Sequence, residues 1–149
     1  MLKGENRVKL EILLVEDDPA QVYLVDKALQ RWKSPYQLHL CSTAEDALEF
    51  VNRQNGHTRA PRPHIALVDL NLPKEPGFTV IKAIKSNPDL RSIAVMVLTS
   101  SKSPSDLKAA FDLHANAYFQ KPMSYDAIEQ MFEALEKFWR LDVRYMLPG

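Results

Sequence analysis

Short apolar runs alternate along this chain with segments in which apolar residues recur at helical spacing. The apolar runs predict strands over residues 10–15, 36–41, 64–68, 93–98 and 117–120. The helical segments predict helices that begin near residues 19, 42, 78, 104 and 125. The run 93–98 is almost wholly apolar, which is typical of a strand covered on both faces. Five strand-then-helix units predict a parallel sheet with helices on both sides.

Polar residues mark where several of the predicted helices begin. Asp18 before Pro19 combines an acidic N-cap with proline at the first helical position. Ser42, followed three residues later by Glu45, has the capping-box pattern and predicts the start of a helix that runs to about residue 53. The fourth helix is expected to span about 104–115. Ser124 is expected to cap the last helix, which should end near residue 140 and bury one face. That face consists of Ile128, Met131, Phe132, Leu135, Phe138 and Trp139.

The segment 141–149 carries a different pattern. Leu141, Val143, Tyr145 and Leu147 alternate with other residues, and this period of two predicts an extended segment with one apolar face. Such a face needs a covering surface. That surface is either the segment's own domain or a second copy of the chain, and we favour the second copy, which makes a homodimer.

Length and composition narrow the function classes. The 149 residues predict one domain, 1–149, with a core over about 10–140. The 19 basic and 19 acidic side chains cancel, so no net positive charge favours nucleic acid or an anionic membrane. No signal peptide and no apolar run of membrane-spanning length is present, so a cytoplasmic protein is expected. Cys41, the only cysteine, is expected to be a small buried hydrophobe.

Chemically active residues follow the ends of four predicted strands. Glu16 and Asp17 follow the first strand, Asp69 the third, Thr99 the fourth, and Lys121 the fifth. In open α/β sheets, ligands bind outside the carboxyl ends of the strands. We therefore expect three carboxylates, a hydroxyl and an ammonium group to meet at one edge of the sheet.

Carboxylates gathered this closely repel one another unless a cation lies among them. Oxygen ligands suit a hard divalent ion, and Mg²⁺ fits best where phosphate also binds. Asp17 and Asp69 are the expected direct ligands. The backbone carbonyl of Asn71 is a third candidate, and Glu16 is expected to act through water.

With a metal present, the Asp69 carboxylate is a candidate nucleophile toward phosphorus, forming an aspartyl phosphate. Catalysis of phosphoryl transfer consists mainly of positioning and charge stabilisation. The metal, Lys121 and the Thr99 hydroxyl would each take one oxygen of the transferring group.

Four short segments together resemble the receiver domains of response regulators over about residues 10–140. They are ILLVEDDP (12–19), LVDLNLP (67–73), VLTSS (97–101) and AYFQKP (117–122). The resemblance implies a flavodoxin-like, doubly wound, five-stranded parallel sheet in a (βα)5 three-layer sandwich. It implies Asp69 as phosphoacceptor, Thr99 and Tyr118 as switch residues, and a Lys121-Pro122 bond of a kind that is often cis.

A narrower likeness concerns the small single-domain regulators of bacterial phytochrome histidine kinases. It rests on 60–73, 87–101, 112–122 and the segment EKFWRLDVRYMLP (136–148). It implies a histidine kinase, a phytochrome, as the partner. Pro76-Gly77 departs from the Asp-Gly of many relatives. Only nine residues follow the expected last helix, so signalling by protein contacts is expected, without a DNA-binding output domain.

Two other functions are alternatives to that of a phosphorylated response regulator. A pseudo-receiver would keep the fold as a protein-binding platform without phosphorylation. An aspartate-nucleophile phosphatase would carry a second aspartate two residues after the nucleophile, where this chain has Asn71. We expect no metabolic enzyme, but a domain that catalyses its own phosphotransfer and slow dephosphorylation. The four histidines, at positions 39, 57, 64 and 114, are expected to have structural or solvent-facing roles.

Overall fold

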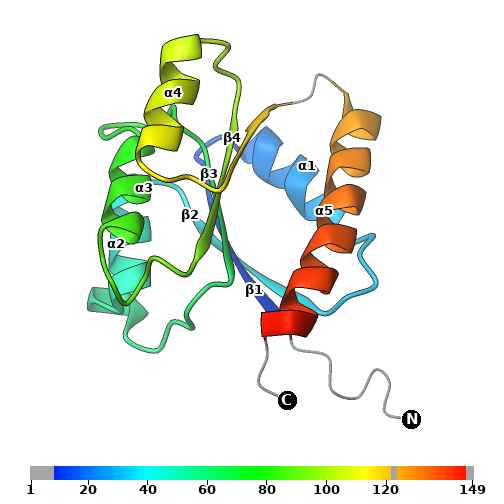
Figure 1. Cartoon of the computed structure of the whole chain (residues 1–149), viewed down its shortest axis with the longest axis horizontal. Coiled ribbons are helices and arrows are strands. Elements are labelled where there is room, and N and C mark those ends of the chain that lie inside the picture. The colour runs from blue at the N-terminus through cyan, green and yellow to red at the C-terminus, as the bar shows by residue number, and fades with distance from the viewer. Residues whose placement is uncertain (1–8, 122–123, 147–149) are drawn as a thin grey trace.

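The strands form one parallel sheet in the order β2-β1-β3-β4-β5 (Figure 1). The computed structural model describes residues 9–121 and 124–146, and at 138 and 140–146 it describes the backbone alone. The strands are β1 (Leu10–Val15), β2 (Tyr36–Cys41), β3 (Ile65–Val68), β4 (Ala94–Thr99) and β5 (Ala117–Gln120). The helices are α1 (Pro19–Leu29), α2 (Ala44–Asn52), the 3-10 helix η1 (Asn55–His57), α3 (Phe78–Lys85), α4 (Pro104–Asp112) and α5 (Tyr125–Met146).

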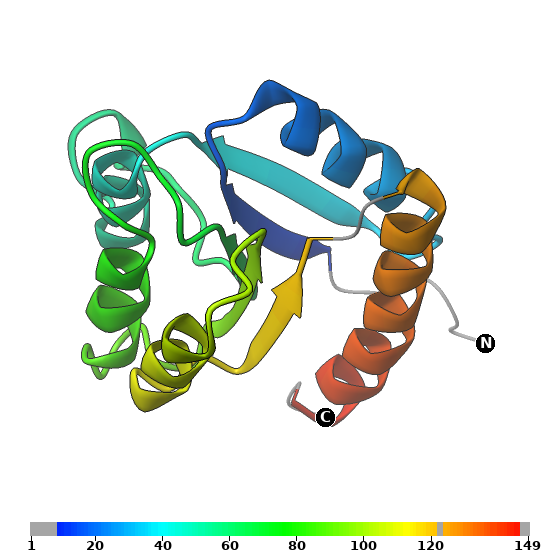
Figure 2. The same ribbon diagram turned by 90° about the horizontal axis from the view of Figure 1, so that it is seen from above.

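The sheet is the middle layer of three. Helices α1 and α5 cover one face, and α2, α3 and α4 cover the other (Figure 2). This is the flavodoxin-like, doubly wound arrangement that the sequence predicts. The chain reverses its direction of winding between β1 and β3, and the crevice at such a reversal is where ligands bind in this architecture.

Burial on both faces explains why the central strands read as continuous apolar runs. In β1, Leu13 and Val15 join the core under α2, α3 and α4, whereas Ile12 and Leu14 join the core under α1 and α5. All four are essentially fully buried. Burying each such side chain contributes about 1.5–3 kcal/mol. The alternation therefore anchors β1 from both sides and fixes where its carboxyl end lies.

The helix starts agree with the predictions, with one shift. Asp18 caps α1, since its Oδ1 accepts a hydrogen bond from the Ala20 amide at 2.9 Å. The prediction of Ser42 as the cap of α2 is wrong by one residue. Thr43 caps this helix, and its Oγ1 accepts from the Asp46 amide at 3.1 Å. Two hydroxyl residues in succession offer the same chemistry, and the backbone conformation decides between them.

Two helix ends differ from the predictions. Helix α4 ends at Asp112, earlier than expected, and His114 follows in the left-handed region with φ 72°. Helix α5 continues to Met146, so the prediction of an extended segment from residue 141 is wrong for residues 141–146. The apolar residues there also fit a helix, because Leu141 and Tyr145 are four residues apart and no glycine or proline intervenes. Residues 147–149 lie outside the described part.

The predicted buried face of α5 is confirmed for Ile128, Phe132, Leu135 and Trp139. Met131 is partly buried, and the side chain of Phe138 lies outside the described part. Trp32, three residues after the end of α1, donates its indole N–H to the Phe132 carbonyl of α5 at 2.9 Å. None of the helices in the described residues is long and apolar enough to cross a membrane.

Candidate functional site

The ends of four neighbouring strands, β1, β3, β4 and β5, bring the candidate residues to one edge of the sheet. Val15 of β1 and Val97 of β4 both pair with Val68 of β3, so the strands end at similar heights. Asp69 directly follows β3, and its amide donates to the Val15 carbonyl at 3.1 Å. The sheet register thus fixes the Asp69 backbone beside the start of the acidic segment after β1.

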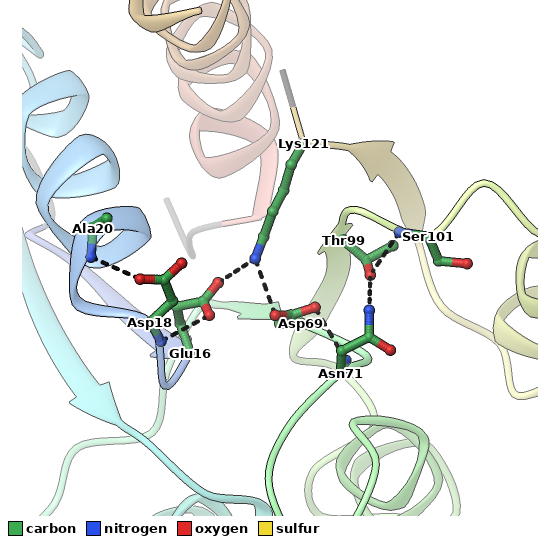
Figure 3. A network of polar contacts seen from close by, with 8 residues as sticks. All are labelled: Glu16, Asp18, Ala20, Asp69, Asn71, Thr99, Ser101 and Lys121. Carbon is green, nitrogen blue, oxygen red and sulfur yellow. Dashed lines mark hydrogen bonds and ion pairs between the residues drawn. The ribbon is translucent and has the colours of Figure 1, made fainter. Parts of the chain in front are cut away.

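Lys121 lies between two buried carboxylates (Figure 3). Its Nζ is 2.7 Å from Glu16 Oε1 and 3.0 Å from Asp69 Oδ2. Burial raises the pKa of Glu16, although the hydrogen bond from Lys121 opposes that shift. Burial alone would lower the pKa of Lys121, but its hydrogen bonds to Glu16 and Asp69 outweigh this and raise it. The ammonium group therefore stays charged and partly neutralises the cluster.

The three carboxylates form a group suited to a divalent cation. Glu16, Asp17 and Asp69 each offer one oxygen, and these oxygens lie within 4.8 Å of one another. The donor set is all oxygen, which is what hard divalent ions select. Glu16 has both oxygens engaged, one by Lys121 and the other by the Asp18 amide at 3.1 Å. Both Asp69 oxygens are engaged as well, by Lys121 and the Asn71 amide, whereas Asp17 is the exposed member of the group.

Thr99 and Asn71 lie on the side of Asp69 away from Lys121 (Figure 3). The Asn71 amide donates to Asp69 Oδ1 at 3.1 Å, and its side-chain Nδ2 is 3.4 Å from Thr99 Oγ1. The Ser101 amide also donates to Thr99 Oγ1, at 3.3 Å. Thr99 is fully buried. The predicted hydroxyl therefore lies beside Asp69, held by two donors.

Tyr118 lies outside the carboxylate cluster. It is partly buried against the core under α2, α3 and α4, and its hydroxyl donates to the Ser101 carbonyl at 3.5 Å. The Ser101 hydroxyl donates to Asp106 of α4 at 2.6 Å. Tyr118 therefore touches the loop that follows Thr99, a position from which it can respond to movement of that loop. The predicted Lys121-Pro122 bond lies outside the described residues.

Gly77 supports the site, and the sequence interpretation did not assign it this role. A Cβ at this position would lie 2.1 Å from the carbonyl oxygen of Asp69. The Gly77 amide donates to the Leu70 carbonyl at 2.9 Å. The start of α3 thus packs directly on the backbone of Asp69. The Pro76-Gly77 pair marks a helix start in the sequence, but the close approach is visible only in three dimensions.

Replacing Gly77 with alanine should destabilise the protein by about 1–3 kcal/mol, because the new methyl group forces the start of α3 away from Asp69. Urea unfolding followed by circular dichroism measures this change. Gly56→Ala is the matched control, since a Cβ there meets no heavy atom within 4 Å. Equal stability of the two variants would contradict the close packing of Gly77.

A doubly wound parallel sheet, with an aspartate and a lysine paired at its carboxyl edge beside further carboxylates and a threonine, defines a receiver-type domain. The family model of the response regulator receiver domain matches residues 12–133, and the chain belongs to this family. Receiver domains of this family are typically signalling domains.

Comparison with similar proteins indicates which group of receiver domains this chain resembles. Response regulator Rcp1 of Synechocystis sp. is 38% identical over 138 residues, which cover 93% of this chain and 94% of that protein. The structure of the phosphorylated cyanobacterial phytochrome response regulator RcpA matches with a TM-score of 0.85 and 33% identity, covering 89% of this chain and 94% of the other. The Mn²⁺-bound form of Rcp1 matches with a TM-score of 0.82 and 38% identity, covering 87% and 94%. The chain therefore resembles phytochrome response regulators over nearly its full length.

Proposed function

We propose that this chain accepts a phosphoryl group on Asp69 from the phosphohistidine of a histidine kinase. The observation that carries this proposal is the environment of the Asp69 carboxylate. One of its oxygens faces the Lys121 ammonium at 3.0 Å, and the other accepts the Asn71 amide at 3.1 Å. A carboxylate held in this way stays fixed in place, and such positioning is a large part of phosphoryl-transfer catalysis.

The chemistry uses groups that the site already holds. A carboxylate oxygen of Asp69 attacks phosphorus, the phosphorus–nitrogen bond of the donor breaks, and the imidazole nitrogen keeps the electron pair and takes a proton. Lys121 is placed to neutralise one oxygen of the transferring group, and Thr99 to hydrogen-bond another. Water attack on the aspartyl phosphate would later return the free carboxylate. The chain thus catalyses its own phosphorylation and slow dephosphorylation.

The donor set of Glu16, Asp17 and Asp69 supports a divalent ion, for which we propose Mg²⁺. Bound there, the ion would neutralise negative charge on the carboxylates and on the phosphoryl group. Asp17 and Asp69 are the proposed direct ligands, with the Asn71 carbonyl as a third. Glu16 is proposed to act through water, and its two oxygens contact Lys121 and the Asp18 amide.

The proposed kinase partner is a bacterial phytochrome. Light would then be the signal that controls phosphorylation, and the cytoplasm would be where this protein acts. Its support is the likeness to regulators described as phytochrome partners, Rcp1 and RcpA among them. Output would pass through protein contacts of this domain. Phosphotransfer from a panel of purified histidine kinases tests the pairing. A clear rate preference for a phytochrome kinase supports it, and preference for an unrelated kinase contradicts it.

A small phosphodonor and Mg²⁺ test the phosphoacceptor function without any kinase. Intact-protein mass spectrometry should then show one added phosphate, and EDTA should prevent its addition. An unmodified protein under conditions that phosphorylate another receiver domain would instead favour the pseudo-receiver alternative.

We further propose that phosphorylation shifts Thr99 toward the phosphoryl group and that Tyr118 moves with it. Both residues contact the loop at Ser101, and Ser101 is bonded to α4, so this loop links the site to the face formed by α4 and β5. In Thr99→Ala, phosphorylation should no longer change the NMR chemical shifts of α4. Shift changes equal to those of the wild type would contradict the switch.

We propose a homodimer in which residues 141–149 contribute to the contact. The segment is rich in large apolar residues, and Leu107 and Phe111 of α4 are also 40% and 46% exposed. The full chain should sediment as a dimer, and a chain that ends at Arg140 should sediment as a monomer. Far-ultraviolet circular dichroism controls for folding of the shortened chain. An unchanged mass on truncation would contradict the role of this segment.

A further inference from the structure

A second group of metal-ligating side chains lies at the end of β2. It is separate from the group of Glu16, Asp17 and Asp69, which we call the acidic cluster. The Cys41 sulfur, an Asp46 oxygen and a His57 ring nitrogen lie within 4.8 Å of one another. Cys41 ends β2, Asp46 lies in the first turn of α2, and His57 ends η1. Three separate elements thus bring sulfur, oxygen and nitrogen ligands together.

The positions of these side chains are well determined by their surroundings. Asp46 donates its amide to the cap residue Thr43, which fixes the first turn of α2. The His57 ring packs edge-on against Phe50, with ring centroids 5.3 Å apart. Its backbone is held at both sides, donating to Gln54 and accepting from Ala60, each at 3.0 Å. The cluster is therefore preorganised rather than a chance meeting of mobile surface groups.

Burial gives the cluster an inner and an outer side. Cys41 is 1% exposed, whereas the side chains of His57 and Asp46 are 27% and 40% exposed. An ion could therefore enter from the side of Asp46 and His57 and meet the sulfur at the inner end. A fourth coordination position would face solvent and could take a water molecule, as in three-ligand zinc sites.

We propose that Cys41, Asp46 and His57 form a second metal site, which takes a zinc-type borderline cation and not Mg²⁺. Thiolate and imidazole are ligands that zinc favours, whereas Mg²⁺ takes oxygen ligands. In a tetrahedral zinc site the nitrogen and oxygen ligands are about 3.3 Å apart. His57 Nε2 and Asp46 Oδ1 are now hydrogen-bonded at 2.7 Å, so a small rotation of these partly exposed side chains admits the ion.

Binding of a metal ion to Cys41 requires loss of the thiol proton. Burial raises the pKa of Cys41, and a hydrogen bond to Asp46 adds to this shift. The sulfur therefore stays protonated on its own and is a poor nucleophile. A metal ion replaces the proton directly: the sulfur–hydrogen bond breaks, a sulfur–metal bond forms, and the proton passes to water.

The location also joins this site to the acidic cluster. The Glu16 amide donates to the Cys41 carbonyl at 3.0 Å, so the ends of β1 and β2 are hydrogen-bonded here. An ion on Cys41 would therefore bind next to the strand end that carries Glu16, but through different ligands. The two sites differ in donor chemistry, and an excess of Mg²⁺ separates them experimentally.

Co²⁺ in place of zinc supplies a specific readout with the full-length, reduced protein. Cys41 is the only cysteine, so a thiolate-to-cobalt charge-transfer band in the near ultraviolet can come only from this residue. The band should appear at one equivalent of Co²⁺ in the presence of excess Mg²⁺, and Zn²⁺ should displace it. It should persist in Asp69→Asn, because that residue belongs to the acidic cluster.

Two variants decide the assignment. Cys41→Ser should abolish the band. His57→Ala changes a partly exposed side chain, and it should weaken Zn²⁺ binding, measured by calorimetry, by about tenfold to a hundredfold. His114→Ala, at an exposed histidine outside the cluster, should leave Zn²⁺ affinity unchanged. Absence of the band in the wild type, or equal Zn²⁺ affinity in His57→Ala, would overturn the proposal and leave Asp46–His57 as a structural hydrogen bond.

Discussion

Asp69→Asn should lose phosphorylation from a small phosphodonor completely, within the detection limit of intact-protein mass spectrometry. The amide oxygen of asparagine is neutral and a far weaker nucleophile than a carboxylate, so no aspartyl phosphate can form. The change keeps the shape of the side chain. It also keeps an oxygen that can accept the Asn71 amide, which now donates to Asp69 Oδ1 at 3.1 Å. The loss should therefore be chemical rather than structural.

Asp18→Asn is the matched control for this experiment. This variant makes the same carboxylate-to-amide change at a residue two positions from Glu16. The Asp18 side chain, however, caps α1 by accepting a hydrogen bond from the Ala20 amide. Asparagine is an equally good N-cap, so both folding and phosphorylation should remain at wild-type levels. If Asp69→Asn gained one phosphate as readily as Asp18→Asn does, the phosphoacceptor would lie elsewhere and the proposed site would be wrong.

Lys121→Met should lower the free energy of unfolding by about 3 kcal/mol in EDTA, since it leaves two buried carboxylates without their cation. Glu16 and Asp69 are 3% and 6% exposed as side chains and both contact the Lys121 ammonium. Added Mg²⁺ should restore part of the loss, because a bound ion replaces the missing charge and stabilises the folded state. Phosphorylation should also slow by roughly 10²–10³. Urea unfolding with and without Mg²⁺ measures the stability.

Lys108→Met supplies the comparison for an exposed lysine. Lys108 also pairs with a carboxylate, Asp112 at 2.8 Å, but its side chain is 76% exposed. Exposed pairs of this helical spacing contribute only about 0.3–0.5 kcal/mol. A similar loss in both variants would show that the Lys121 pair has no special role. Stability of Lys121→Met that does not depend on Mg²⁺ would argue against a cation bound beside Lys121.

The pattern of apolar residues was sufficient to predict the architecture, because a doubly wound sheet buries its strands on both faces. The strand 10–15 has the predicted bounds, and α3 begins at the predicted residue 78. Helix ends were less predictable. Ser42 and Thr43 carry the same capping group, and the local backbone selects Thr43. Residues 141–146 fit two periodicities, and the uninterrupted continuation of α5 decides for the helix.

The sequence by itself determined which residues meet at the carboxyl edge of the sheet. Each of them directly follows or ends a strand, and parallel strands align their ends. Only the tertiary structure decided which of these residues are in contact. Lys121 bridges Glu16 and Asp69, and the backbone of Asp69 leaves no room for a side chain at Gly77. It also brought His57 back to Asp46 and Cys41, although sequence spacing gave no sign of a metal cluster there. Contacts between distant segments depend on how the helices pack on the sheet, and the local pattern of residues does not determine that packing.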